Sequence, residues 1–276
     1  MYNSAIALCF AMPAEGGHNV DTLGDGAALP RWLARYDRTP VTLGESGASV
    51  ERLTCGEHTL YIKMGAGPGA ALVREEIARL RWLHGRLAVP ELLDSADDGA
   101  RCWMVMSAIA GHPASDAELT AEPAATVALL AEALLALHAT PLDGCPFDHR
   151  AEAELARARR NVAERRVDVT DFDDERAGRT PESLLAELRA AIPDGSLRLT
   201  HGDACLPNVL FAAGRLSGWI DLGRAGVGDP YRDLALCVRS AARNLGPQWA
   251  APLLNAYGAD AQDPRIVWYQ TLDELF

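Results

Sequence analysis

The sequence predicts an α+β fold of two lobes, an antiparallel sheet lobe followed by a mostly helical lobe. Short strand-like runs separated by glycine-containing turns fill the chain between Pro40 and residue 107. Beyond them, long segments rich in Ala, Leu and Glu place apolar residues at helical spacing. We therefore expect an N-terminal extension at 1–27, a sheet lobe at 28–107 and a helical lobe at 108–276.

Composition and charge fit a globular protein and narrow its partners. The 276 residues are 49% hydrophobic and 23% charged, which is ordinary for a folded chain with a sizeable core. A formal net charge of −12 argues against nucleic acid or anionic membrane as the main partner and suits a polycationic ligand. The six cysteines form no C-x-x-C motif, and no apolar run approaches the ~18 residues of a membrane span. We expect reduced thiols and a cytoplasmic location.

The sheet lobe is predicted from successive strand-like runs. V-T-L-G-E-S-G-A-S-V-E-R-L holds a turn at 44–49, and T-L-Y-I-K follows it across the hairpin connection C-G-E-H. V-P-E-L-L-D and R-C-W-M-V-M-S supply two more strands. A helix lies between these pairs, with apolar residues in helical rhythm at Val73, Ile77, Leu80 and Leu83. The expected lobe is five antiparallel strands around one helix.

Lys63 stands at the end of the apolar run T-L-Y-I and is the first candidate for a functional charge. Its stem would be buried at the end of a strand, so its ammonium group needs a carboxylate partner. Glu76 lies beside the apolar stripe of the predicted helix, from which it can reach the strand. We expect Lys63 and Glu76 to pair, with Glu75 as the alternative partner.

The second lobe begins with a strongly predicted helix. E-P-A-A-T-V-A-L-L-A-E-A-L-L-A-L-H has Pro123 near its start and apolar residues along one face. His138 at its end is expected to pack or cap. A charged surface helix follows in A-E-A-E-L-A-R-A-R-R-N-V-A-E-R-R. The next loop gathers acids that alone would form a solvated charge run, namely Asp168, Asp171, Asp173, Asp174 and Glu175.

The stretch from Leu199 to Asp233 carries the chemistry. The runs V-L-F and W-I flank A-A-G-R and are predicted to pair, which brings together His201, Asp203, Asn208 and Asp221. Carboxylate and amide oxygens suit Mg²⁺ and leave room for substrate phosphates. An Asp, an Asn five residues later and a further Asp also match a kinase catalytic loop. We expect phosphoryl transfer with Asp203 as catalytic base and with Asn208 and Asp221 on the metal.

These segments resemble the aminoglycoside phosphotransferases, in particular the 3'-phosphotransferases of the kanamycin and neomycin type. The resemblance rests on H-G-D-A-C-L-P-N, I-D-L-G-R-A-G-V-G-D and the closing L-D-E-L-F, and it extends from about Gly44 to the C-terminus. It implies a protein-kinase-like fold and ATP-dependent phosphorylation of an aminoglycoside, with the 3'-hydroxyl as the expected acceptor. The biological role that it implies is antibiotic resistance.

The resemblance also assigns the nucleotide side of the site. Ser46, in the turn at 44–49, would contact the nucleotide, and Lys63, steadied by Glu76, would hold its phosphates. The distance to W-L in the family pattern favours Glu76 over Glu75. At the hinge that ends the sheet lobe, Ser107 to Ile109 would present backbone N–H and C=O groups to an adenine edge. The expected cofactors are ATP, with GTP as the alternative, and Mg²⁺.

On the acceptor side, the resemblance points to several charged groups. Three acids of the loop would meet the amino groups of the drug, and these are Asp173, Asp174 and Glu175. Asp203 would face the acceptor hydroxyl, and three residues nearer the C-terminus complete the predicted substrate contacts, namely Arg239, Glu274 and Phe276. Where some relatives carry an acid, this sequence has Ser240 and Arg243, which would narrow or shift the range of drugs.

The last helix is expected to begin near Pro264, with Leu272, Leu275 and Phe276 in apolar contact. In addition, two other classes of function stay open. A related kinase of choline, homoserine, a sugar or another antibiotic would share the core motifs, although the acidic loop and L-D-E-L-F argue against it. A nucleotide-binding pseudoenzyme is the other class, and the intact kinase residues argue against that. We expect a monomer or a weak dimer.

Overall fold

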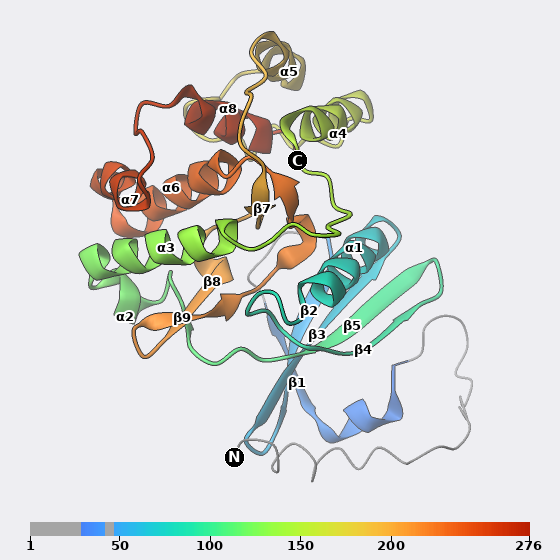
Figure 1. Cartoon of the computed structure of the whole chain (residues 1–276). Coiled ribbons are helices and arrows are strands. Elements are labelled where there is room, and N and C mark those ends of the chain that lie inside the picture. The colour runs from blue at the N-terminus through green and yellow to red at the C-terminus, as the bar shows by residue number, and fades with distance from the viewer. Residues whose placement is uncertain (1–28, 42–46) are drawn as a thin grey trace.

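A five-stranded sheet with one helix and a larger group of helices form the two lobes of the molecule (Figure 1). The computed structural model describes residues 29–41 and 47–276. Ser46 and the predicted extension at 1–27 lie outside the described residues. Among the residues that are described, no helix combines the length and the apolar character needed to cross a membrane.

The sheet of the first lobe has the strand order β1-β2-β3-β5-β4, and every neighbouring pair is antiparallel. Its strands are β1 (Asp37–Val41), β2 (Ser49–Cys55), β3 (His58–Ala66), β4 (Leu92–Asp97) and β5 (Arg101–Ser107). The sequence pattern placed the start of the first strand at Pro40, and the strand begins three residues earlier, at Asp37. Five antiparallel strands were predicted, and the structure confirms them.

The two faces of this sheet pack against different elements. Trp103 and Val105 of β5 point to the face that packs with Leu33 of the short 3₁₀ helix Arg31–Arg35. Cys102 and Met104 point to the opposite face, against α1 (Pro68–Leu83), because successive side chains of a strand alternate. The four predicted apolar positions of α1 are all buried, at about 1.5–3 kcal/mol each for a large side chain.

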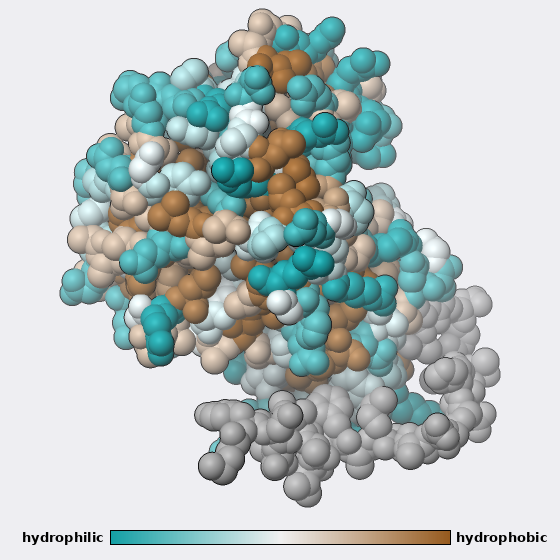
Figure 2. Space-filling view, viewed as in Figure 1, coloured by the Kyte–Doolittle hydropathy of each residue, from teal (hydrophilic) through white to brown (hydrophobic). Residues whose placement is uncertain are grey.

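The second lobe is mostly helical, as predicted. The described part contains α2 (Ala117–Thr120), α3 (Pro123–His138), α4 (Ala151–Ala163), α5 (Pro181–Ala190), α6 (Tyr231–Leu245), α7 (Ala250–Tyr257) and α8 (Pro264–Asp273). His138 at the end of α3 is buried and contacts Tyr257 Oη at 2.8 Å and Asp233 Oδ2 at 3.1 Å, in keeping with the packing role predicted for it. Figure 2 shows hydrophilic residues around much of the rim of the visible face and hydrophobic ones nearer its middle.

Short strands lie in the second lobe on the side of the first. β8 (Val209–Ala212) and β9 (Arg215–Trp219) form the predicted antiparallel pair, with Val209 opposite Trp219, and β6 (His112–Pro113) joins its edge. β7 (Arg198–Thr200) pairs with β10 (Gly226–Gly228) in a second, two-stranded sheet. These pairings hold the loops at 201–208 and 220–225 next to each other.

The chain end differs in part from the sequence prediction. Helix α8 begins at Pro264, as expected, and Leu272 and Leu275 are buried. Phe276 is 41% exposed, so its predicted apolar packing is wrong. Its ring lies 5.0 Å below the Arg224 guanidinium carbon, and this cation–π contact takes the place of a core position.

Candidate active site

Lys63 contacts two carboxylates, one in each lobe. Its Nζ atom is 2.6 Å from Glu76 Oε2 on α1 and 2.8 Å from Asp221 Oδ1, which lies just after β9. The predicted pair with Glu76 is therefore present. Glu75, the alternative partner, is 59% exposed and contacts Arg79 instead.

Burial and charge act in opposite directions on this group. Burial alone would favour a neutral lysine, but the charges of Glu76 and Asp221 outweigh it and raise the pKa of Lys63. Lys63 likewise lowers the pKa of Asp221 against the effect of burial. The ammonium and the Asp221 carboxylate are both charged at neutral pH, so the site presents a fixed cation beside an anion.

The loop at 201–208 is held from below by α6. The backbone N–H groups of His201 and Gly202 both donate to the Asp233 carboxylate at 2.7 Å. Within the loop, Asn208 Nδ2 donates to the carbonyl oxygen of Asp203 at 3.0 Å and to its carboxylate at 3.1 Å. Asp203 is half-buried. The hydrogen bond from Asn208 orients its carboxylate at the edge of the loop.

The second loop, at 220–225, lies directly against the first. Ile220 N–H donates to Asn208 O at 3.0 Å, and His201 Nε2 lies 2.9 Å from Ile220 O. Gly202 has φ +82, and a Cβ at this position would lie 2.2 Å from Arg224 O. Only glycine permits this approach. Asp203, Asn208 and Asp221 thus lie on adjoining loops, as their spacing predicted.

Asn208 and Asp221 fit a magnesium site shared with a phosphate ligand. The described residues contain no group of three or more His, Cys, Asp or Glu that could hold a metal ion by itself. Mg²⁺ in phosphoryl-transfer sites takes only one or two protein oxygens and completes its shell with phosphates and water. Asn208 turns its nitrogen toward Asp203, which leaves the amide oxygen as its acceptor, and the Asp221 side chain is 43% exposed.

An acidic pocket of about 90 Å³ opens near these loops. It is lined by Asp168, Asp171, Phe172, Arg239, Arg243, Asp273, Glu274 and Phe276. Arg239 lies between two of the carboxylates, in contact with Asp273 and 3.1 Å from Glu274 Oε1. Asp273 also accepts from Arg224 at 3.0 Å, and the Arg224 backbone packs on Gly202. Arg224 therefore connects the acidic pocket to the loop that carries Asp203.

Comparison with known proteins identifies the class of this site. Residues 37–268 match the phosphotransferase enzyme family. The chain belongs to this family. An aminoglycoside 3'-phosphotransferase from Streptomyces fradiae is 38% identical over 267 residues, which cover 91% of this chain and 100% of that protein. This match and the family assignment confirm the resemblance that the motifs indicated.

Solved structures agree with this assignment. An aminoglycoside-3'-phosphotransferase of type VIII has a TM-score of 0.77 at 35% identity, covering 88% of this chain and 94% of that one. An aminoglycoside phosphotransferase from Streptomyces rimosus in complex with ADP and streptomycin has a TM-score of 0.74 at 28% identity, covering 86% and 92%. The predicted protein-kinase-like, two-lobed fold is confirmed for this phosphotransferase.

The pocket lining of the phosphotransferase includes two acids of this loop and leaves out the three that the resemblance singled out. Asp168 and Asp171 line the pocket, whereas Asp174 and Glu175 are exposed outside its lining. Asp173 is turned to Arg176 Nη1 at 2.6 Å, which lowers its pKa although burial opposes the shift. A count of charges in the sequence cannot show that Asp173 is held in this ion pair.

Three further positions, Ser107, Ile109 and Ser240, make contacts that the sequence did not indicate. Ser107 N–H donates to Glu91 O at 2.9 Å within the sheet, so this amide cannot serve an adenine edge. The Ile109 side chain packs against Gly218, and the backbone role expected at this residue stays a prediction. Ser240 is buried and its Oγ accepts from Leu206 N–H at 3.0 Å. It therefore supports the loop of Asp203 rather than facing substrate.

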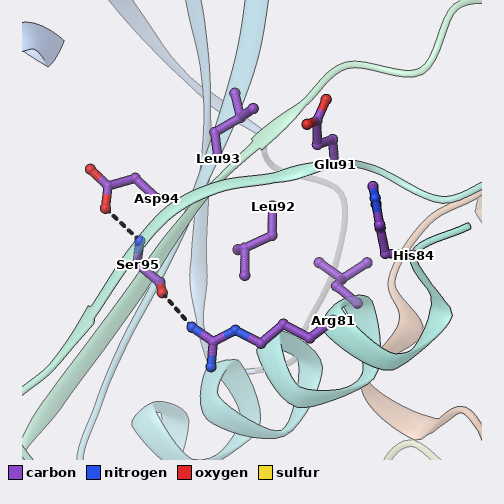
Figure 3. A pocket seen from close by; sticks show the side chains of 8 residues that line it. Arg81, His84, Glu91, Leu92, Leu93, Asp94 and Ser95 are labelled. Carbon is purple, nitrogen blue, oxygen red and sulfur yellow. Dashed lines mark hydrogen bonds between the residues drawn. The ribbon is translucent and has the colours of Figure 1, made fainter. Parts of the chain in front are cut away.

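Two acids of the site, Asp233 and Asp273, were not among the predicted site residues. Asp233 holds the loop of Asp203 through two backbone N–H groups, and Asp273 lies in the acidic pocket. Asp233 ends the stretch that begins at Leu199, and Asp273 stands in the closing L-D-E-L-F. A second hollow, of about 530 Å³, lies between α1 and β4 and is lined by Arg81, His84 and Leu92 among others (Figure 3). Its lining includes none of the predicted site residues.

Proposed function

We infer that this phosphotransferase transfers the γ-phosphoryl group of ATP to a hydroxyl group of an aminoglycoside, at the 3' position. The observation that carries the inference is the link between the acidic pocket and the loop that holds the predicted catalytic base. Arg224 connects the acidic pocket, through Asp273, to the loop of Asp203. A carboxylate placed to receive a hydroxyl proton thus adjoins a pocket suited to a polycation.

The roles of the residues follow from where their atoms lie. Asp203 would orient the acceptor hydroxyl and take its proton, and Asn208 fixes the Asp203 carboxylate by a hydrogen bond of 3.1 Å. Lys63 would hold the phosphates of the nucleotide while Glu76 keeps its ammonium in place. Asn208 and Asp221 would hold Mg²⁺, which offsets negative charge on the phosphate oxygens.

The acidic pocket would recognise the ammonium groups of the acceptor. Asp168, Asp171, Asp273 and Glu274 contribute four carboxylates to its lining. Arg239 neutralises part of this charge and holds two of the carboxylates in position. Ammonium groups of an aminoglycoside would bind at Glu274 and at the acids that Arg239 does not hold, where charge-assisted hydrogen bonds are stronger than neutral ones. Choline or homoserine, with one cationic group each, would leave most of these acids unpaired.

We propose the 3' position because the similar proteins are aminoglycoside 3'-phosphotransferases. Identifying the phosphorylated position of the product tests it. The purified full chain is incubated with Mg-ATP and with kanamycin, a close 3'-deoxy analogue, streptomycin, choline or homoserine, and the product is analysed by NMR. We expect phosphorylated kanamycin and no turnover of the 3'-deoxy analogue. Equal turnover of those two drugs would move the reaction to another hydroxyl. Turnover of choline or homoserine alone would replace the proposed substrate class.

Whether GTP replaces ATP is decided in the same assay by exchanging the nucleotide at equal concentration. We propose ATP as the donor because a relative has been solved with ADP bound. A kcat/KM for GTP above that for ATP would reverse this preference. A chain that binds nucleotide but phosphorylates none of these acceptors would be the pseudoenzyme.

A further inference from the structure

Helix α1 holds both ends of the loop that follows Asp221. Glu76 Oε1 accepts from Leu222 N–H at 3.2 Å, and Arg79 Nε donates to Ala225 O at 2.8 Å. Positions three apart on a helix face the same way, so both side chains leave α1 toward this loop. The 3₁₀ turn between the two contacts, Leu222–Arg224, has no side-chain cap of its own.

Arg79 uses its remaining donors within the same buried region. It is 5% exposed, and Nη1 donates to Glu75 O at 3.0 Å. Its Nη2 atom is 2.9 Å from His149 Nε2, and the guanidinium carbon lies 4.7 Å from the centre of the Phe147 ring. Burial lowers the pKa of Arg79, with the charges of Arg157 and Arg232 acting in the same direction. A cation in such a place is retained because several acceptors converge on it.

His149 completes the arrangement as a neutral acceptor. Arginine can only donate, so His149 Nε2 must accept from Arg79. Burial and the charge of Arg232 lower the pKa of His149 to about 4, although Glu154 opposes the shift. Its Nδ1 atom lies 2.5 Å from Glu154 Oε1 and 2.9 Å from Arg232 Nη1. The ring thus links Arg79 of the first lobe to a buried carboxylate of the second.

The segment that carries His149 is itself paired with the strand after the loop. Val227 N–H donates to Phe147 O, and His149 N–H donates to Val227 O, both at 2.8 Å. Arg79 therefore reaches the loop at 221–225 at Ala225 and reaches the neighbouring segment at His149. Its Nε group therefore acts directly on the backbone of the loop, and its Nη2 group acts through the His149 side chain on the segment that pairs with β10.

Asp221 needs such support because its own backbone is strained. Its φ is +58 and its ψ +58, a left-handed conformation that costs a residue with a side chain about 1–2 kcal/mol. A conformation of this kind persists only where the surrounding structure enforces it. The hydrogen bonds at Leu222 and Ala225 are the contacts from α1 that do so on the far side of Asp221.

We propose that Arg79 is a positioning residue for phosphoryl transfer. By holding Ala225 it keeps the 221–225 loop closed on α1 and so keeps the Asp221 carboxylate where it would meet the metal and Lys63. Arg79 touches neither nucleotide nor acceptor in this role. The inference rests on the proposed function in taking Asp221 as the metal ligand.

The test compares three variants of the full chain. R79M keeps the apolar stem and removes every donor, and R79K keeps the charge with a single donor group. R81M is the matched control, because Arg81 lies on the same helix but its Nη2 contacts Ser95 Oγ on β4, at 3.2 Å. Calorimetry measures MgADP binding over a range of Mg²⁺ concentrations, hydrogen exchange follows the amides of 221–228 without ligand, and kinetics give kcat and both KM values.

We expect R79M to need ~10–100-fold more Mg²⁺ for nucleotide binding and to lose kcat by a similar factor, as when a group that orients a metal ligand is removed. The Leu222 amide should exchange faster in ligand-free R79M, and the acceptor KM should stay within about twofold of wild type. R79K should recover part of the Mg²⁺ affinity, and R81M should match wild type. A purely structural role would instead lower the melting temperature and leave the Mg²⁺ dependence of the folded fraction unchanged.

Wild-type Mg²⁺ dependence and exchange in R79M would overturn the inference. If R79M does not fold, R79K decides by the same measurements, and normal Mg²⁺ dependence in R79K overturns it. A wild-type chain that binds no nucleotide with Mg²⁺ overturns the proposed function and this inference together. Binding of MgADP without phosphorylation of any aminoglycoside overturns only the proposed substrate, and the calorimetry on R79M still decides the role of Arg79.

Discussion

Lys63 and Asp221 are 158 residues apart in the sequence, and the ammonium nitrogen of one lies 2.8 Å from a carboxylate oxygen of the other. The contact closes the two lobes on each other at the centre of the site. The nucleotide phosphates would compete with Asp221 for Lys63, while Glu76 retains it from the other side. We expect the exchange to release the Asp221 carboxylate for Mg²⁺ when the nucleotide binds.

Replacing Asp203 by Ala should remove nearly all turnover and leave nucleotide affinity largely unchanged. Asp203 is predicted to receive the acceptor proton, and a general base contributes typically ~10²–10⁴-fold. Steady-state kcat and calorimetric MgADP binding are the measurements. The variant D97N, at an exposed ion pair with Arg74, is the control. More than about a tenth of wild-type kcat in Asp203→Ala would exclude this role.

Replacing Asp221 by Asn should weaken the use of Mg-ATP far more than acceptor binding. The amide removes a full charge from the metal site and from the contact with Lys63 at 2.8 Å. We expect the Mg²⁺ concentration at half-maximal rate to rise by ~10–100-fold, with the acceptor KM within about twofold. A nucleotide complex with Mg²⁺ in which Asp221 lies well away from the ion would contradict the assignment.

Glu274 should make drug binding depend on pH near neutrality. Burial, together with the charge of Asp173, raises the pKa of Glu274 to about 7, although Arg239 acts in the opposite direction. Below that pH the free protein holds a proton on Glu274, which an incoming ammonium group must displace. The acceptor KM should therefore rise as the pH falls from about 8 to 6, by up to ~10-fold per unit for one proton.

The variant E274Q separates this effect from titration of the drug. An amide cannot titrate, so the pH dependence that belongs to the carboxylate should vanish, while any contribution of the drug's own amines remains. Its acceptor KM at high pH should exceed that of wild type because one charge-assisted hydrogen bond is lost. Identical pH profiles of acceptor KM in both proteins would show that Glu274 does not face the ammonium groups.

Arg243 should restrict the range of drugs. It is exposed and lines the acidic pocket beside carboxylates that would bind ammonium groups. R243E reverses this charge and should lower the KM for the most highly charged aminoglycosides, by ~3–10-fold at low salt and less at high salt. R215E, at an exposed arginine of β9 outside the pocket lining, is the control. An equal change in both variants would indicate only the effect of net charge.

Much of the site could be predicted because it depends on sequence patterns that extend over only a few residues. The pair β8 and β9 follows from two short apolar runs around a tight turn, and their pairing alone brings Asn208 near Asp221. Lys63 and Glu76 were paired because a strand end and a helix face thirteen residues apart leave few other partners for a buried ammonium. Strand alternation and helical spacing act over a few residues, so they are visible in the sequence.

The sequence by itself determined the fold class, the helix starts at Pro123 and Pro264, and the set of Lys63, Asp203, Asn208 and Asp221. Only the tertiary structure decided which acids line the pocket. It also decided that Asp233 and Arg79 hold the two catalytic loops by their backbones, since these contacts join segments up to 146 residues apart. The physical reason is that a backbone carbonyl or N–H is the same group at every residue, so the sequence does not mark which one a buried side chain will bind.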